Sequence, residues 1–144
     1  MQTTRLFGAI CSLHRALVRN NDVNLAEYGI TSVQLHTLIF VHVKTMLNQK
    51  VCQRDIERET GLRPSSVSAM LTNLEKANLI ERVSSEEDAR TKYIELRAAG
   101  AEICEKNKEL MDKCDEQICG ALSKEEQVQL KNLLSKVQKS ILNK

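Results

Sequence analysis

Apolar residues near both ends of the chain recur every three or four positions, which is the period of an amphipathic helix. In the first such segment these residues are Leu6, Ile10, Leu13 and Leu17. Thr31 or Ser32 can cap a second helix, because a hydroxyl oxygen there accepts an otherwise unpaired N–H of the first turn. That helix continues through Leu35, Leu38, Ile39 and Val43. The polar stretch 44–50 predicts a loop after it.

The middle of the chain predicts two helices joined by a tight turn. The first helix is short, with Ile56 facing inward, and Gly61 can end it in a left-handed conformation. Pro64 suits the first turn of the next helix, because its missing N–H would have no helical partner there. The apolar positions of this second helix have the spacing of one helical face: Val67, Met70, Leu71 and Leu74.

After Asn78 the pattern changes from helical to alternating. Residues 79–83 and 91–96 predict two strands, and the polar residues 84–90 predict a hairpin loop between them. Two further helices are predicted over residues 98–118 and 124–141, the second with a Ser123–Glu126 capping box. This order of elements predicts a mainly α fold with a small β-hairpin wing. We therefore expect a winged helix-turn-helix with additional N- and C-terminal helices.

Composition narrows the class of protein. The chain has 144 residues, of which 42% are hydrophobic and 28% charged, a balance that suits one packed domain. Aromatic residues make up 3% and proline occurs once, which favours a helical core of aliphatic side chains. The five cysteines include no CxxC pair, and the first residues are too polar for a secretory signal. We expect reduced thiols, a cytoplasmic location and no membrane span.

The second helix of the helix-turn-helix has an exposed face that suits a DNA major groove. Its side chains are small or form hydrogen bonds, with Glu75 as the only acid, whereas solvated faces usually mix Glu with Lys. Such side chains can read base edges, and Arg63 and Lys76 can contact phosphates. We predict DNA contacts from Arg63, Ser65, Ser66, Ser68, Ala69, Thr72, Asn73 and Lys76.

The hairpin supplies a second group of candidate DNA contacts. Arg90 and Lys92 lie at its tip and on its return strand. An Arg on a thin β-loop can enter a narrow minor groove, where the negative potential is strongest. Asp88 is expected to pair with Arg90 and to hold its orientation.

Four short motifs, in order along the chain, match those of one known family. Asp88, Arg90, Leu96 and Gly100 match the wing signature D-x-R-x(5)-L-T-x-x-G. Residues 30–34 and 122–126 match the starts of the family's second and last helices, and residues 74–80 match its LE-x-x-G-L-I segment. The chain thus resembles the MarR family of bacterial regulators. It departs from the family at Arg97, where a capping Thr is usual, and at Asn78, where Gly is usual.

The resemblance implies a homodimeric regulator of transcription that binds double-stranded DNA. Residues 31–100 would form the DNA-binding core, and the helices within residues 1–30 and 101–144 would join two copies. The apolar stripes of these terminal helices support this view, because soluble monomers avoid large exposed apolar patches. A two-fold dimer predicts a palindromic operator with half-sites about one turn, ~10 bp, apart. We expect a repressor that responds to a ligand or to stress.

The resemblance also implies a small-molecule effector, without indicating which one. Cys11 and Cys52 are candidate redox sensors, the first by its place in the first helix and the second because a helix N-terminus lowers a thiol pKa. Both could equally be small core or capping residues. The three histidines lack metal-ligand spacing, so no metal and no cofactor are expected.

The sequence gives less support to two other classes of function. A winged helix can serve as a protein-interaction module, but its recognition face would then be expected to carry apolar or aromatic anchors. The predicted face has none. An enzyme would need a phosphate-binding glycine loop, a nucleophile with its base, or paired carboxylates, and the sequence contains no such motif.

Overall fold

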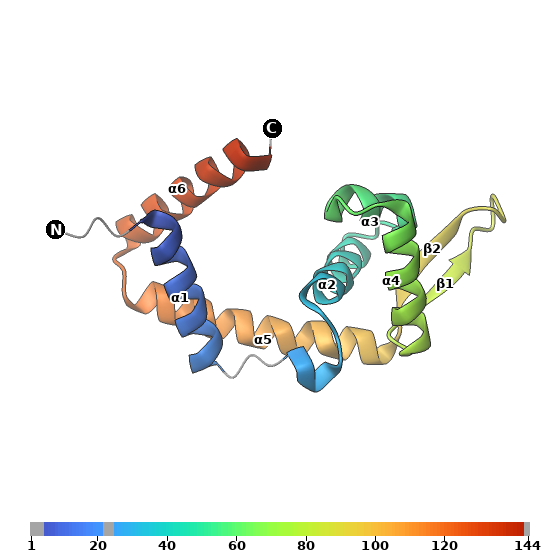
Figure 1. The fold of residues 1–144 in the computed structure, drawn as a ribbon, viewed down its shortest axis with the longest axis horizontal. Helices are drawn as coiled ribbons and strands as arrows, with labels where there is room; N and C mark the ends of the chain where they lie inside the picture. Colours follow the sequence, from blue (N-terminus) through green and yellow to red (C-terminus); the bar gives the residue numbers. More distant parts are fainter. Residues whose placement is uncertain (1–4, 22–24, 143–144) are drawn as a thin grey trace. The chain divides into compact units, whose positions relative to one another are not determined.

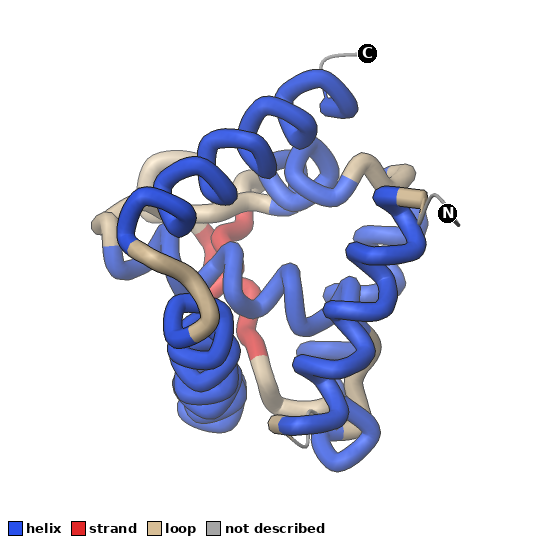
Figure 2. The backbone as a smooth tube through the Cα atoms, turned by 90° about the vertical axis from the view of Figure 1, so that its left-hand side faces the viewer, coloured by secondary structure: helices blue, strands red, loops and turns tan. Residues whose placement is uncertain are grey.

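A computed structural model describes residues 5–21 and 25–142 of the chain. Helices dominate, and one pair of strands is present in the described residues (Figures 1 and 2). The elements are α1 (Leu6–Asn20), η1 (Leu25–Tyr28), α2 (Ser32–Met46), α3 (Gln53–Thr60), α4 (Pro64–Lys76), β1 (Ile80–Ser84), β2 (Lys92–Leu96), α5 (Ala98–Gly120) and α6 (Lys124–Leu142). They form two compact units, which we call the winged unit (residues 24–108) and the terminal unit (residues 1–23 and 109–144). The predicted fold class is confirmed.

The winged unit contains all the buried apolar side chains of the described residues. The apolar stripe predicted for α4 lies at its centre, where Val67 and Leu71 are fully buried and Leu74 is almost so. Leu38 from α2, Ile56 from α3 and Ile80 from β1 pack into the same core. One apolar face from each element therefore meets in a single core, which fixes α3, α4 and the hairpin relative to one another.

Local sequence signals set the ends of the helices. Thr31 caps α2 and forms a capping box with Gln34, while Ser123 and Glu126 form the predicted box at the start of α6. Gly61 ends α3 at φ 69°. Asn78 has φ 60°, which Asn tolerates better than most residues. The turns on either side of α4 are thereby fixed by residues that accept a left-handed backbone.

The hairpin pairs β1 with β2 in antiparallel register, with Arg82 opposite Ile94. Both strands lie within one residue of their predicted starts and ends. A short bridge between Cys52 and Tyr93 adds a third segment, and the Ile94 N–H donates to the Val51 carbonyl at 2.7 Å. The pattern of residues along the chain does not indicate this bridge. It matters because it attaches the residues that begin α3 directly to the wing.

Near α2, one prediction was incomplete and one short element was not predicted. The helix continues to Met46, so the predicted loop over residues 44–50 is shorter than expected. A 3-10 helix, η1, precedes the turn at Gly29, which has φ 64°. Lys44 and Met46 are common in helices, and the polar character of the stretch reflects its exposure rather than a loop.

Gly100 is required where α5 begins. A Cβ atom at this position would lie 2.2 Å from the carbonyl oxygen of Leu79. That carbonyl also accepts the N–H of Arg97 at 3.0 Å, so the backbone cannot easily move away. Arg97, which replaces the family's usual Thr, extends its side chain to Glu81 at 3.3 Å. The glycine of the wing signature therefore permits close packing of α5 against the segment that leaves α4.

The terminal unit has no buried residue among the described residues of α1 and α6, and its apolar side chains lie at the surface. Leu6 and Phe7 of α1 are 83% and 78% exposed, and Ile141 of α6 is 66% exposed. An apolar groove of about 610 Å³ runs between the two helices, lined by Leu6, Ile10, Leu130, Leu133, Leu134, Val137, Gln138 and Ile141. A second apolar groove in this unit joins Leu13 and Leu17 of α1 to Ile118 and Leu122.

Candidate nucleic-acid interface

The predicted recognition face of α4 is exposed. Ser65, Ser66, Ala69, Asn73 and Lys76 lie on the surface, and Ser68 and Thr72 are half-buried at its edge. Arg63 precedes the helix and is also exposed. The buried stripe lies on the opposite side, so the face can approach a partner without disturbing the core. The structure brings all eight predicted residues of this helix and its lead-in together on one surface.

Arg82 of β1 was not predicted and supports this face from behind. Its Nη2 donates to the Ser68 carbonyl at 3.3 Å and to the Thr72 Oγ1 at 3.2 Å. Its Nε lies 3.9 Å from a carboxylate oxygen of Glu75, the one acid of the helix. Ser68 and Thr72 are therefore partly engaged within the protein, and the negative charge of Glu75 is partly balanced. An arginine two residues after a buried apolar residue of a strand, and so on the same face of it, is the signal that could have indicated this role.

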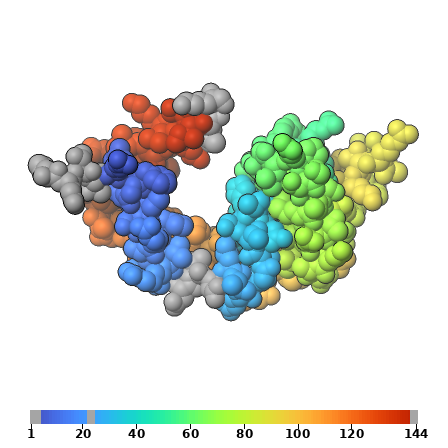
Figure 3. Space-filling view, in the orientation of Figure 1, coloured from blue at the N-terminus to red at the C-terminus, as the bar shows by residue number. Residues whose placement is uncertain are grey.

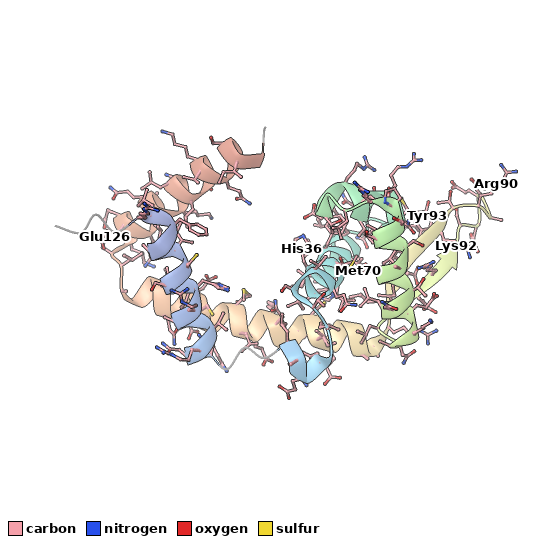
Figure 4. The ribbon with its side chains drawn as sticks, in the orientation of Figure 1. His36, Met70, Arg90, Lys92, Tyr93 and Glu126 are labelled. Carbon is pink, nitrogen blue, oxygen red and sulfur yellow. The ribbon has the colours of Figure 1, made fainter. Side chains whose placement is uncertain are left out.

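The wing carries the second group of predicted contacts. The hairpin projects from the helices of the winged unit (Figure 3), and Arg90 lies at its free end with its side chain directed away from the strands (Figure 4). Lys92 begins β2 and is exposed. Neither side chain forms an ion pair with another described residue. Two cations are therefore presented on a thin, extended support.

The predicted pairing of Asp88 with the Arg90 side chain is wrong. Asp88 Oδ1 accepts the backbone N–H of Arg90 at 3.0 Å, and its Oδ2 accepts the Thr91 hydroxyl at 3.3 Å. A short acidic side chain satisfies nearby turn N–H groups more easily than it reaches a guanidinium two residues away. Asp88 therefore shapes the turn and leaves the Arg90 guanidinium free.

Hydrogen bonds hold the first turn of α3 together and also join it to α4. Asp55 accepts from the Cys52 N–H at 2.9 Å, from the Cys52 thiol at 3.2 Å and from Arg58 at 2.7 Å. Partial burial alone would raise the pKa of Asp55, but these hydrogen bonds and the Arg58 charge together hold it below its ordinary value. Gln53 donates to Glu57 on its own helix and to the Pro64 carbonyl at 3.3 Å. Gln53 thus joins the two helices of the helix-turn-helix, while Asp55 fixes the start of α3.

The candidate redox residues lie in different surroundings. Cys11 is half-buried on α1, and Cys52 is half-buried as the residue that precedes α3. Burial, and to a lesser extent Glu105, raise the pKa of the Cys104 thiol to about 11, which makes it a poor nucleophile.

Within the described residues, no group of three or more His, Cys, Asp or Glu side chains is arranged to hold a metal ion. No helix of the described chain is long and apolar enough to cross a membrane.

A helix-turn-helix that presents α4, followed by a cationic hairpin, defines a winged helix-turn-helix protein. A sequence profile described as the MarR family matches residues 28–91. The HTH-type transcriptional regulator FarR of Neisseria gonorrhoeae is 36% identical over 86 residues, which cover 60% of this chain and 59% of FarR. The chain thus matches less than two thirds of the length of this curated relative.

Solved structures give a match over nearly the full length. The DNA complex of MepR from Staphylococcus aureus superimposes with a TM-score of 0.76 at 26% identity, covering 98% of this chain and 99% of MepR. MepR bound to ethidium bromide has a TM-score of 0.70 at 27% identity, covering 95% and 96%. With the four motifs and the wing geometry, these matches support a regulator of the MarR type. The relatives named here are transcription regulators, and none is an enzyme.

Proposed function

We propose that this protein is a sequence-specific DNA-binding transcription regulator. The observation that carries the proposal is the exposed face of α4, whose small and hydrogen-bonding side chains are flanked by Arg63 and Lys76. Such a face fits a major groove, where Asn and Ser can read base edges while the cations contact phosphates. The likeness to MepR in complex with DNA supports the same mode of binding.

The wing extends the proposed contact into a neighbouring minor groove. Arg90 forms no ion pair with a described residue, because Asp88 accepts hydrogen bonds from the turn instead. A guanidinium on a thin loop suits the narrow, strongly negative minor groove of A·T-rich DNA. Arg90 and Lys92 would then contribute affinity, whereas Asn73 and its neighbours on α4 would contribute sequence preference.

The protein acts, in this proposal, as a homodimer joined by its terminal helices. The apolar groove between α1 and α6, whose lining includes the exposed Leu133 and Leu134, needs a cover that the terminal unit does not provide. A second copy would bury these side chains and would place two copies of α4 for a palindromic operator. In this arrangement, the terminal helices set the distance between the two copies of α4 and so the spacing of the half-sites.

The proposal includes repression and response to a small molecule. A dimer bound across a promoter would exclude the polymerase, and a ligand that changes the separation of the two α4 helices would release it. One solved MepR structure holds ethidium bromide, and MepR is described as a regulator of the multidrug efflux pump MepA. Fluorescence of ethidium added to this protein without DNA measures whether the chain binds such a cation.

Binding of the wing variant Arg90→Ala to a selected operator tests the DNA-binding proposal. We expect affinity to fall by at least about tenfold on every sequence, since Arg90 contacts backbone and groove rather than one base. Glu86→Gln, in the same loop, is the matched control and should bind at least as tightly as the parent. Asn73→Ala should instead reduce the discrimination between the operator and its single-base variants. Equal binding by Arg90→Ala and the parent would contradict the role of the wing.

A further inference from the structure

A groove with strong positive charge lies between the start of α3 and the wing. It has a volume of about 450 Å³, and four of its lining residues are cations: Arg54, Arg82, Arg90 and Lys92. None of the residues that line it is acidic. Four positive charges around one small opening are costly unless an anion occupies it, because like charges repel at short range.

The groove is built by contacts that fix its two walls. The Cys52–Tyr93 bridge and the 2.7 Å bond from the Ile94 N–H to the Val51 carbonyl hold the start of α3 beside β2. Arg82, paired opposite Ile94, is anchored to α4 through Ser68 and Thr72. The walls therefore belong to the same rigid core as the recognition helix.

The cations of the groove are largely uncompensated. The side chains of Arg54, Arg90 and Lys92 form no ion pair with any described residue of the chain. Arg82 has only Glu75, at 3.9 Å from its Nε, and that Nε is buried without a hydrogen-bond partner. Each of these features favours a compact oxyanion with several acceptor oxygens.

We propose that this groove binds one phosphodiester of the DNA backbone, with Arg54 and Arg82 as its principal contacts. The inference rests on the proposed function, because it adds to the DNA interface of α4 and the wing tip a clamp that the sequence did not indicate. Since the groove shares Arg82 with the support of α4, a phosphate held here fixes the register in which α4 meets the bases. Arg54 and Arg82 are thus backbone-positioning residues and do not read sequence.

The salt dependence of DNA binding tests this inference through Arg54→Gln. Arg54 is exposed, so the change removes one charge without disturbing the core. We expect affinity for the operator and for unrelated duplexes to fall equally, by about tenfold, and the slope of log K against log salt to lose about 0.9. Arg58→Gln is the matched control, because Arg58 lies one turn further along α3 and is already paired with Asp55. It should leave the slope unchanged.

A neutral linkage in the DNA separates this contact from general electrostatics. A set of operators carries a single methylphosphonate at each position of each strand in turn. At one position, we expect the methylphosphonate to lower the affinity of the parent protein about tenfold and that of Arg54→Gln hardly at all. If the affinity losses from the methylphosphonate and from Arg54→Gln add at every position, the inference is overturned while the proposed function stays intact. Inorganic phosphate that binds the DNA-free parent, with an unchanged slope for Arg54→Gln, would assign the groove to a free anion and also overturn it. A parent that binds no duplex would instead overturn the proposed function.

Discussion

The winged unit and the terminal unit bury their apolar residues in different ways. The winged unit packs Leu38, Ile56 and Leu71 into a core of its own, from which solvent is excluded. The terminal unit leaves Leu6, Leu133 and other apolar side chains on its surface. The first arrangement is sufficient for a folded unit, whereas the second is expected to be completed by a partner. This difference supports the proposal that one chain forms a complete recognition unit, while a second chain is needed to pair two such units.

Truncation of one leucine in each unit should give the clearest difference between the two units. Leu71→Ala is expected to lower the free energy of unfolding by about 2–5 kcal/mol, since it leaves a cavity in the core of the winged unit. Urea unfolding followed by circular dichroism measures this change. Leu133→Ala is the control in the terminal unit and should instead raise the protein concentration at which the dimer dissociates. Similar losses for both variants at high protein concentration would contradict the distinction.

Two glycines of α5 provide a finer comparison. Gly100→Ala should destabilise the protein by about 1–3 kcal/mol, because the new Cβ would overlap the Leu79 carbonyl that packs against it. Gly120→Ala, in the terminal unit, meets no atom within 4 Å and should stabilise by up to about 1 kcal/mol. Melting temperatures of the two variants, measured side by side, check both signs. Equal shifts for the two would mean that α5 does not pack closely at its start.

The smallest expected effect concerns the carboxylate at the start of α3. The pKa of Asp55 is lower in the folded chain than its ordinary value of 3.8, so its contribution to stability is complete above that pH and disappears as the pH falls below it. Asp55→Asn should cost about 0.5–1 kcal/mol at pH 7 and progressively less below about pH 4. Asp112→Asn, an exposed carboxylate of α5 with no ion pair among the described residues, should show no such trend. A pH-independent difference for Asp55→Asn would contradict the assigned hydrogen bonds.

Local signals explain what the sequence predicted correctly. Capping pairs such as Ser123 with Glu126, the glycine at position 61 and the change of period after Asn78 each act within a few residues. They are therefore readable without knowing the fold, and the helices and strands begin where these signals place them. The stripe of α4 could likewise be assigned to the core by its spacing alone.

Contacts between distant residues explain what the sequence did not reveal. The bridge from Cys52 to Tyr93 and the reach of Arg82 to Thr72 depend on which elements pack together, and no spacing records that. Arg54 was missed for the same reason, because no sequence spacing places the start of a short helix beside the wing. Asp88 was assigned the wrong partner because its charge was considered and the competing turn N–H groups were not. Whether the predicted α4 and wing residues contact DNA stays a prediction.

The central claim is that the terminal unit pairs two winged units so that two copies of α4 read one operator. Operator duplexes recovered from a random pool provide the most direct test, once 5 bp are inserted between the two half-sites. The insertion rotates one half-site by about half a helical turn around the duplex relative to the other. A rigid dimer can then engage only one of them. We predict that affinity falls to that of an isolated half-site. Unchanged affinity after the insertion, or recovery of sequences without two-fold symmetry, would contradict the account.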